Sequence, residues 1–173
     1  EMVLGGLNRL PGEAQIHHQA YRDDPSVVNS IPMPDGELLS ALQQPAIDAW
    51  AARVRVPAVI SSERASRGVV MLGVDPIAES ALGAEPGTIV EGRALTGPED
   101  KGVLIGAKLL ARLETSLGRR IVLMSQDPDN EVADRGARIV GVYRAEMQTT
   151  EEQYLYTGRA ATQAMLDIEG LVS

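Results

Sequence analysis

The sequence predicts an α+β fold in which a split βαβ sheet is interrupted by a β-rich insertion. Three observations predict this class. The length of 173 residues suits one ordinary domain, helical and strand-like runs alternate near both ends, and the middle consists mostly of strand-like runs separated by turn residues. Right-handed crossovers would join the two end units into one sheet. We therefore assign residues 1–60 and 150–173 to one subdomain and residues 61–149 to the insertion.

The first end unit is predicted to be strand, helix, strand. A short strand is expected at 14–18, after a Pro-Gly turn. Asp35 is the expected N-cap of a helix over 35–43. Apolar and other residues alternate along 51–60, as in a strand with one buried face. Residues 19–34, between the first strand and the helix, form a loop of unusual length for a compact domain.

The insertion contains half of the predicted strands. They span 69–74, 103–105, 120–124 and 138–142. A short helical turn is expected after Asp75-Pro76, and leucines at helical spacing predict a helix over 109–117 that ends at Gly118. Five glycines and two prolines in 83–102 predict mostly irregular structure. The last two strands are expected to form a hairpin around an acidic loop at 125–136.

The last end unit repeats the first: a strand at 153–157, a helix at 159–167 and a strand that begins at 171. That last strand has no room to be completed. At the other end the chain begins with Glu1, and apolar residues recur at helical spacing over 2–10 without an N-cap ahead of them. We therefore expect a piece of a longer polypeptide, cut on both sides.

Composition excludes several classes of partner and chemistry. With 16 Lys and Arg against 24 Asp and Glu, the net charge is −8, and aromatic residues make up only 3% of the chain. A nucleic-acid surface needs a basic face and stacking rings, so a nucleic-acid partner is not expected. The chain has no cysteine, which excludes thiol catalysis, thiolate metal sites and disulfides.

No motif predicts a catalytic, metal or cofactor site. His17 and His18 would point to opposite faces of a strand and could not easily share a metal ion. The run Asp127-Pro128-Asp129-Asn130-Glu131 begins like a calcium loop, but Val132 replaces the turn glycine and Arg138 replaces the bidentate glutamate. We therefore expect no enzyme activity, no cofactor and no metal.

Two acidic pairs are candidates for acid–base chemistry. They are Glu99-Asp100 and Glu151-Glu152, and both lie in polar segments. Neighbouring carboxylates in such segments are usually solvated caps or loops, and catalysis needs at least one of them buried. The Asp23-Asp24 pair is a weak candidate for a hydrolase on the same grounds.

Five segments, in this order and spacing, resemble the periplasmic core domain of MacB-type and lipoprotein-releasing (LolC/LolE-type) ABC transporter permeases, in the FtsX-like superfamily. They are AQIHH at 14–18, YRDDPS at 21–26, VMLGVDP at 70–76, VLIG at 103–106 and IVGVY at 139–143. The resemblance spans nearly the whole chain. It implies a porter-like, ferredoxin-like sheet with an inserted sabre-like subdomain.

The resemblance also implies a function and partners. Such a domain stands on the periplasmic face of the bacterial inner membrane, between two membrane helices of a permease. It would transmit ATP-driven motion to a cargo or a periplasmic partner during export or extraction of lipids and lipoproteins. A separate cytoplasmic ATP-binding subunit and a second permease subunit would be its partners, with a lipoprotein as one possible cargo. The alternative is a stand-alone periplasmic module that binds a small ligand under a lid formed by 19–34 or 83–102.

The candidate partner-binding residues lie at the expected hairpin tip. They are Asp127, Asp129, Glu131, Asp134 and Arg135. A solvated tip explains them most simply, but an acidic tip can also contact a partner. In lipoprotein-releasing permeases the corresponding loop carries a Pro-rich hook for the lipoprotein carrier. Here the loop at 125–137 is shorter, acidic and has a single proline, so carrier binding by a hook is not transferred.

Overall fold

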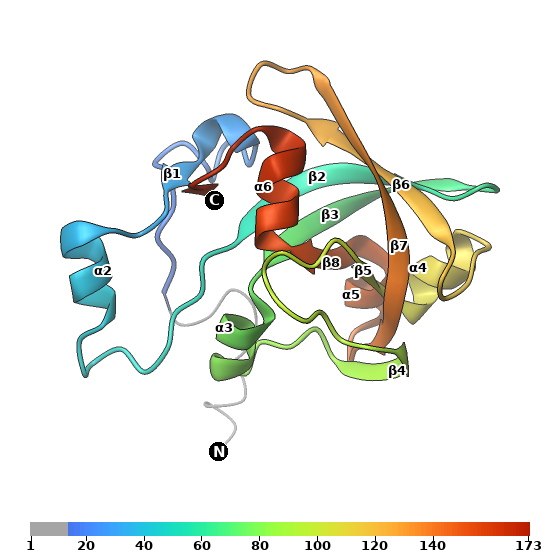
Figure 1. Ribbon diagram of the computed structural model, residues 1–173, viewed down its shortest axis with the longest axis horizontal. Helices are drawn as coiled ribbons and strands as arrows, with labels where there is room; N and C mark the ends of the chain where they lie inside the picture. Colours follow the sequence, from blue (N-terminus) through green and yellow to red (C-terminus); the bar gives the residue numbers. More distant parts are fainter. Residues whose placement is uncertain (1–13) are drawn as a thin grey trace.

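A closed β-barrel forms the centre of the protein (Figure 1). The computed structural model describes residues 14–173. Within this range the main sheet has the strand order β4-β7-β5-β8-β3-β2-β6, and an additional β7–β6 pairing closes every strand except β4 into a ring. The strands are β2 (Val54–Ser61), β3 (Ser66–Val74), β4 (Thr88–Gly92), β5 (Val103–Gly106), β6 (Arg120–Gln126), β7 (Val132–Arg144) and β8 (Tyr154–Gly158).

Alternating apolar residues explain why these strands close on themselves. In β2, Val54, Val56, Ala58 and Ile60 are buried, while Arg55, Pro57 and Val59 between them are exposed. β2 pairs antiparallel with both β3 and β6, and β8 lies parallel to β3 on its other side. When the strands close into a ring, their apolar faces all point inward and pack against one another. The barrel interior is therefore the main hydrophobic core.

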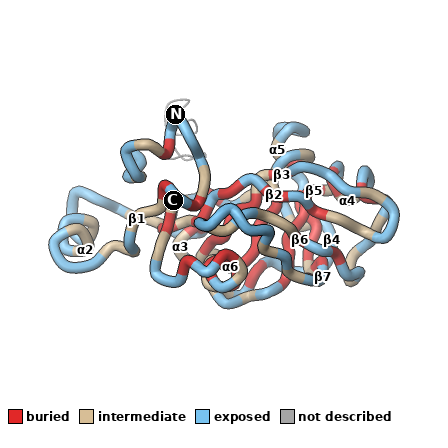
Figure 2. The backbone as a smooth tube through the Cα atoms, turned by 90° about the horizontal axis from the view of Figure 1, so that it is seen from above, coloured by how far each residue is buried: buried red, intermediate tan, exposed pale blue. Residues whose placement is uncertain are grey.

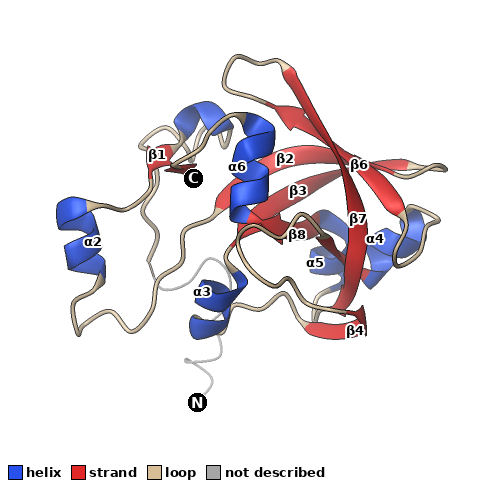
Figure 3. Ribbon diagram, viewed as in Figure 1, coloured by secondary structure: helices blue, strands red, loops and turns tan. Residues whose placement is uncertain are grey.

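Helices cover both ends of the barrel (Figure 3). α4 (Ala107–Arg112) and α5 (Gln148–Gln153) pack against one another and against β5 at one end. α6 (Arg159–Leu166) contacts β2, β3, β7 and β8 at the other. Leu109 and Leu166 are fully buried and belong to the same apolar cluster as the barrel residues.

Two short strands, one before the barrel and one after it, pair beside α6. Here η1 (Val27–Asn29), β1 (Ile31–Pro32) and α2 (Gly36–Leu42) come before the barrel, and β9 (Leu171–Val172) comes after it. β1 and β9 pair antiparallel, and the Ser173 N–H donates to the Arg53 carbonyl at 2.9 Å. α2 has no buried residue and lies at the periphery, whereas buried residues concentrate in the barrel (Figure 2).

The α+β class is confirmed, but the sheet differs from the expected split βαβ arrangement. Residues 14–18 form no strand: Ile16 is 58% exposed, and His17 Nδ1 bonds to the neighbouring carbonyl of His18. β3, from the middle of the chain, lies between β2 and β8. The physical reason is that β2 and β8 bury their apolar faces inside the barrel. β3 pairs with β2 on one side and with β8 on the other, and so satisfies the backbone hydrogen bonds of both.

Hydrogen bonds of the barrel cross both expected subdomain boundaries. β2 and β8, from the segments 1–60 and 150–173, pair with β3, β5 and β6 of the segment 61–149. The division of the chain into two subdomains at these boundaries remains a prediction. The apolar residues at 2–10, expected to be helical, lie outside the described residues.

Three local elements differ in extent from the prediction. The helix expected over 109–117 begins at Ala107 and ends at Arg112, because Glu114 adopts a left-handed backbone with φ 49°. The segment 83–102, expected to be mostly irregular, contains β4. The short helical turn expected after Asp75-Pro76 is α3 (Pro76–Ala81), and the Asp75 side chain caps it. The acidic hairpin loop is shorter than expected, because pairing continues to the Gln126–Val132 pair.

Candidate partner-binding hairpin

The β6–β7 hairpin extends past the barrel and closes at the top of the view in Figure 1. Its strands pair without interruption from Arg120–Arg138 to Gln126–Val132. The hairpin is bound to the barrel on both sides, since β6 pairs with β2 and β7 pairs with β5. Its closed end is therefore a projection on a rigid base.

Asp127 organises the closed end. One oxygen of its carboxylate, Oδ1, accepts hydrogen bonds from the N–H groups of Asp129 and Glu131, both at 2.9 Å. The Asp127 N–H donates to the Glu131 carbonyl at 3.0 Å, and Asn130 adopts a left-handed backbone with φ 61°. These bonds are typical of an aspartate that shapes a turn, so Asp127 sets the conformation of the tip.

Three other carboxylates at the tip face solvent. Asp129, Glu131 and Asp134 are exposed, and within residues 14–173 none of them forms an ion pair. Their charges are free to attract cationic groups of a second molecule. The structure thus brings together four of the five predicted residues as one acidic tip.

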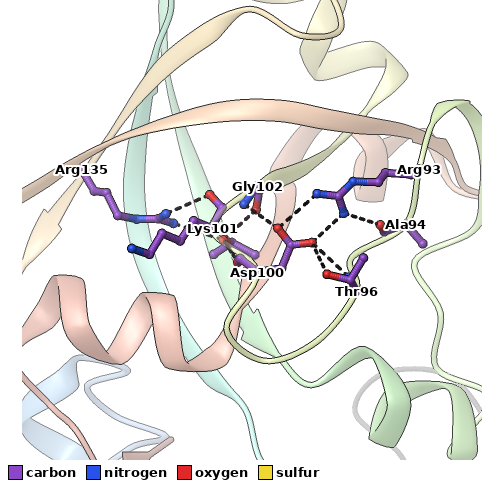
Figure 4. A network of polar contacts seen from close by, with 8 residues as sticks. Arg93, Ala94, Thr96, Asp100, Lys101, Gly102 and Arg135 are labelled. Atoms are coloured by element: carbon purple, nitrogen blue, oxygen red, sulfur yellow. Dashed lines mark hydrogen bonds and ion pairs between the residues drawn. The ribbon is translucent and has the colours of Figure 1, made fainter.

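Arg135 does not belong to this tip. Its side chain turns toward the barrel end, where Nη1 donates to the Lys101 carbonyl at 2.9 Å and Nη2 donates to Thr157 Oγ1 at 3.1 Å (Figure 4). Burial lowers the pKa of Arg135, and its buried Nε has no hydrogen-bond partner in the described part of the chain. Strand alternation gives the reason, because Asp134 and Arg135 must point to opposite faces of β7.

Arg135 binds a loop that Asp100 holds together. Asp100 Oδ2 accepts from Arg93 Nη1 at 2.6 Å and from the N–H and hydroxyl of Thr96 at 3.0 and 3.1 Å (Figure 4). Its Oδ1 accepts from the Gly102 N–H at 2.8 Å. Desolvation alone would raise the pKa of Asp100, but the bonds from Arg93, Gly102 and Thr96 outweigh it and hold the pKa far below its ordinary value.

This Asp100 loop, residues 96–102, is docked on the junction of β8 and α6. The Gly158 N–H donates to the Asp100 carbonyl at 3.0 Å, and the Ala160 N–H donates to the Pro98 carbonyl at 2.8 Å. A Cβ at Gly158 would lie 2.3 Å from the Pro98 oxygen, so only glycine permits this approach. The base of the hairpin is thereby connected, through the loop, to the start of α6.

From α6 the connection continues to the C-terminal strand. Gln163 Nε2, in α6, donates to the Leu171 carbonyl at 2.6 Å, and β9 pairs with β1. Hydrogen bonds therefore connect Arg135, through the Asp100 loop and α6, to the paired strands β1 and β9.

The sequence did not predict that Asp100 is buried, because acidic pairs in polar segments were expected to be solvated. The side chain of Asp100 is only 6% exposed. Glu151 is 5% exposed, and its carboxylate accepts from the Ala145 N–H at 3.0 Å. The signal that could have pointed to Asp100 is its position between Gly97-Pro98 and Gly102, which allows a tight loop around a carboxylate.

Neither a metal cluster nor a membrane-crossing helix is found in the described residues. Among residues 14–173, no group of three or more His, Asp or Glu side chains is placed to hold a metal ion. In the same part of the chain, no helix combines the length and apolarity that crossing a membrane requires.

Two solved structures resemble this chain. The chain is similar to the extracellular domain of the noncanonic ABC-type transporter YknZ from Gram-positive bacteria, with a TM-score of 0.55 at 12% identity over 83% of this chain and 78% of that one. A domain assigned to a permease protein from Porphyromonas gingivalis matches at a TM-score of 0.43 and 18% identity, over 69% of this chain and 55% of that one. The similarity to the YknZ domain shows a shared fold.

The chain belongs to the MacB-like periplasmic core domain family, whose model matches residues 5–169. It is therefore a periplasmic or extracellular domain of an ABC transporter permease, and such permeases work with ATP-binding subunits. The family is a transporter class and not a class of enzymes. No curated protein matches the sequence closely.

Proposed function

We propose that this domain transmits ATP-driven motion of the permease's membrane helices to a periplasmic partner or cargo that contacts the acidic tip. The hydrolysis itself would take place on the separate ATP-binding subunit, and a second permease subunit would complete the transporter. The cargo class proposed is an exported molecule, or a lipid or lipoprotein extracted from the membrane.

The hydrogen-bonded path from β1 and β9 to the hairpin is the observation that supports this proposal. The paired β1 and β9 are tied to β2 through Ser173 and to α6 through Gln163. α6 follows directly on β8, where the Asp100 loop and Arg135 bind. A displacement applied at β1 and β9 would move the hairpin with the barrel, because packed and hydrogen-bonded elements move as rigid bodies.

The acidic tip supports a partner with a basic surface. Asp129, Glu131 and Asp134 are exposed on a projection. They can attract a cationic patch that approaches within about a Debye length, roughly 10 Å at 0.1 M salt. Charges of this kind at the rim of an interface mainly raise the association rate and select the partner.

The test uses the full permease together with its ATP-binding subunit. A variant with Asp129→Asn, Glu131→Gln and Asp134→Asn removes the three exposed tip charges. We expect transport of the native cargo to fall about tenfold or more while ATP hydrolysis without cargo stays unchanged. Transport at the level of the unmodified protein would refute a role for the tip.

A matched control removes the same charge elsewhere. Glu37→Gln, Asp48→Asn and Glu63→Gln change three exposed carboxylates outside the acidic tip that accept no hydrogen bond from any residue of 14–173. This control should transport normally. Because the chain has no cysteine, Asp129→Cys also gives this domain a single thiol for cross-linking to a periplasmic partner in cells.

A further inference from the structure

An apolar groove lies between α3 and the segment 84–96, on the outside of the barrel. Its volume is about 610 Å³, within the range of sites for small molecules. Val74, Leu95 and Leu104 line it and are each at most 8% exposed. Ile77, also in the lining, is 72% exposed. An exposed isoleucine beside a concave apolar surface is typical of a site that a ligand covers.

Tyr156 lines this groove and carries an unpartnered hydroxyl. The residue is 3% exposed, and its buried oxygen has no hydrogen-bond partner among residues 14–173. Its neighbour Tyr143 offers a direct contrast, since that hydroxyl donates to the carbonyls of Thr150 and Tyr154 at 3.0 and 2.9 Å. Buried polar groups almost always find a partner, so an unpartnered hydroxyl beside a groove indicates a missing acceptor.

The position of the Tyr156 hydroxyl is held by packing. Its ring meets the Tyr143 ring edge to face, with centroids 5.6 Å apart and an angle of 81°. Burial raises the pKa of Tyr156 well above its ordinary value, so the group stays a neutral donor at any physiological pH. A donor that is fixed and protonated selects for a ligand atom that accepts.

Charge around the groove limits the kind of ligand. The ionisable lining residues besides Tyr156 are Glu79 and Glu85, and no Lys or Arg lines the groove among the described residues. Glu79 is already neutralised by Arg53, which donates to both of its oxygens at 2.7 Å. An anionic ligand would therefore meet an acidic rim with no cation to receive it.

We propose that this groove binds an uncharged small molecule that has an apolar body and one hydrogen-bond acceptor, which receives the Tyr156 hydroxyl. The walls remove the apolar body from water, and the acceptor satisfies the one unpartnered donor. This site is separate from the acidic tip, and the proposal does not depend on the proposed function.

The test uses Nile red, an uncharged apolar dye with a carbonyl acceptor, titrated by fluorescence against the 173-residue chain. Ala81→Trp fills the groove from the exposed end of α3. We expect this variant to bind Nile red at least tenfold more weakly. Ala111→Trp, at an exposed alanine of α4 outside the groove, is the control and should leave binding unchanged.

Tyr156→Phe tests the hydroxyl itself. The variant should fold, because the removed group makes no hydrogen bond. We expect Nile red to bind about threefold to tenfold more weakly, the loss of one hydrogen bond. Phenylnaphthylamine, an uncharged dye without a carbonyl, should keep its affinity, and its sulfonated analogue should bind more weakly to both proteins. The proposal is overturned if the chain binds no Nile red, if Ala81→Trp and Ala111→Trp behave alike, or if Tyr156→Phe leaves Nile red affinity unchanged.

Discussion

Asp100→Asn should weaken the fold measurably although it changes only one atom of the side chain. The Asp100 carboxylate accepts bonds from Arg93, Thr96 and Gly102, and its side chain is 6% exposed. An asparagine can replace one oxygen as an acceptor. Its amide nitrogen then faces donors, so either the Gly102 bond or the bonds from Arg93 and Thr96 are lost.

The magnitude follows from the bonds that are lost. A hydrogen bond to a charged group contributes about 1.5–3 kcal/mol, and water can replace part of the Arg93 contact because that side chain is 49% exposed. We expect the free energy of unfolding to fall by about 2–3 kcal/mol. For a chain of this size, that corresponds to a Tm lower by roughly 4–12 °C.

Urea unfolding at neutral pH measures this change as a lower midpoint with an unchanged slope. Glu99→Gln is the matched control, since it removes the same charge from the adjacent exposed residue and should alter stability by less than about 0.5 kcal/mol. The reasoning fails if Asp100→Asn unfolds at the same urea concentration as the original chain, or if Glu99→Gln destabilises it equally.

Three further predictions concern pH, glycine and the buried ion pair. The pKa of Asp100 in the folded protein lies below its unfolded value of about 3.9. The ionised carboxylate therefore stabilises the fold fully above that pH, and this stabilisation is lost as the pH falls toward the folded-state pKa. Acid unfolding of Asp100→Asn, followed by circular dichroism, should lack this loss of stability. Gly158→Ala should lower the free energy of unfolding by about 3 kcal/mol, since its Cβ would meet a backbone oxygen at 2.3 Å, whereas Gly136→Ala has open space and should melt normally; equal Tm values would contradict this. Glu79→Gln should cost about 3 kcal/mol in urea unfolding, because it leaves Arg53 buried with a weaker partner, and a loss below about 1 kcal/mol would show the pair to be dispensable.

Local patterns predicted the elements whose apolar residues have a clear period. The alternation in β2 and the Asp75-Pro76 start of α3 are both found in the structure. The family was also identified from short segments in order, and its model matches the chain. β4 was missed because its residues are mostly exposed and pair with β7 alone, so they carry no period of their own.

The acidic tip could be predicted in composition but not in extent. Asp127, Asp129 and Glu131 adjoin one another in sequence, so their clustering requires no tertiary information. Arg135 was placed with them by proximity along the chain, yet strand alternation sends it to Thr157. That partner is 22 residues away, and only the closure of the barrel brings the two together.

What the residues alone determined is the class of the domain, its acidic character and the position of its turns, because these depend on composition and on neighbours within a few residues. Which strands pair, and which charges are buried, was decided by tertiary structure. β3 separates β2 from β8, and Asp100 is enclosed by a loop that docks on Gly158. Both results arise from contacts between segments that are distant in the sequence. The free energy of such contacts depends on how all segments pack into one core, and the local pattern of apolar residues does not predict it.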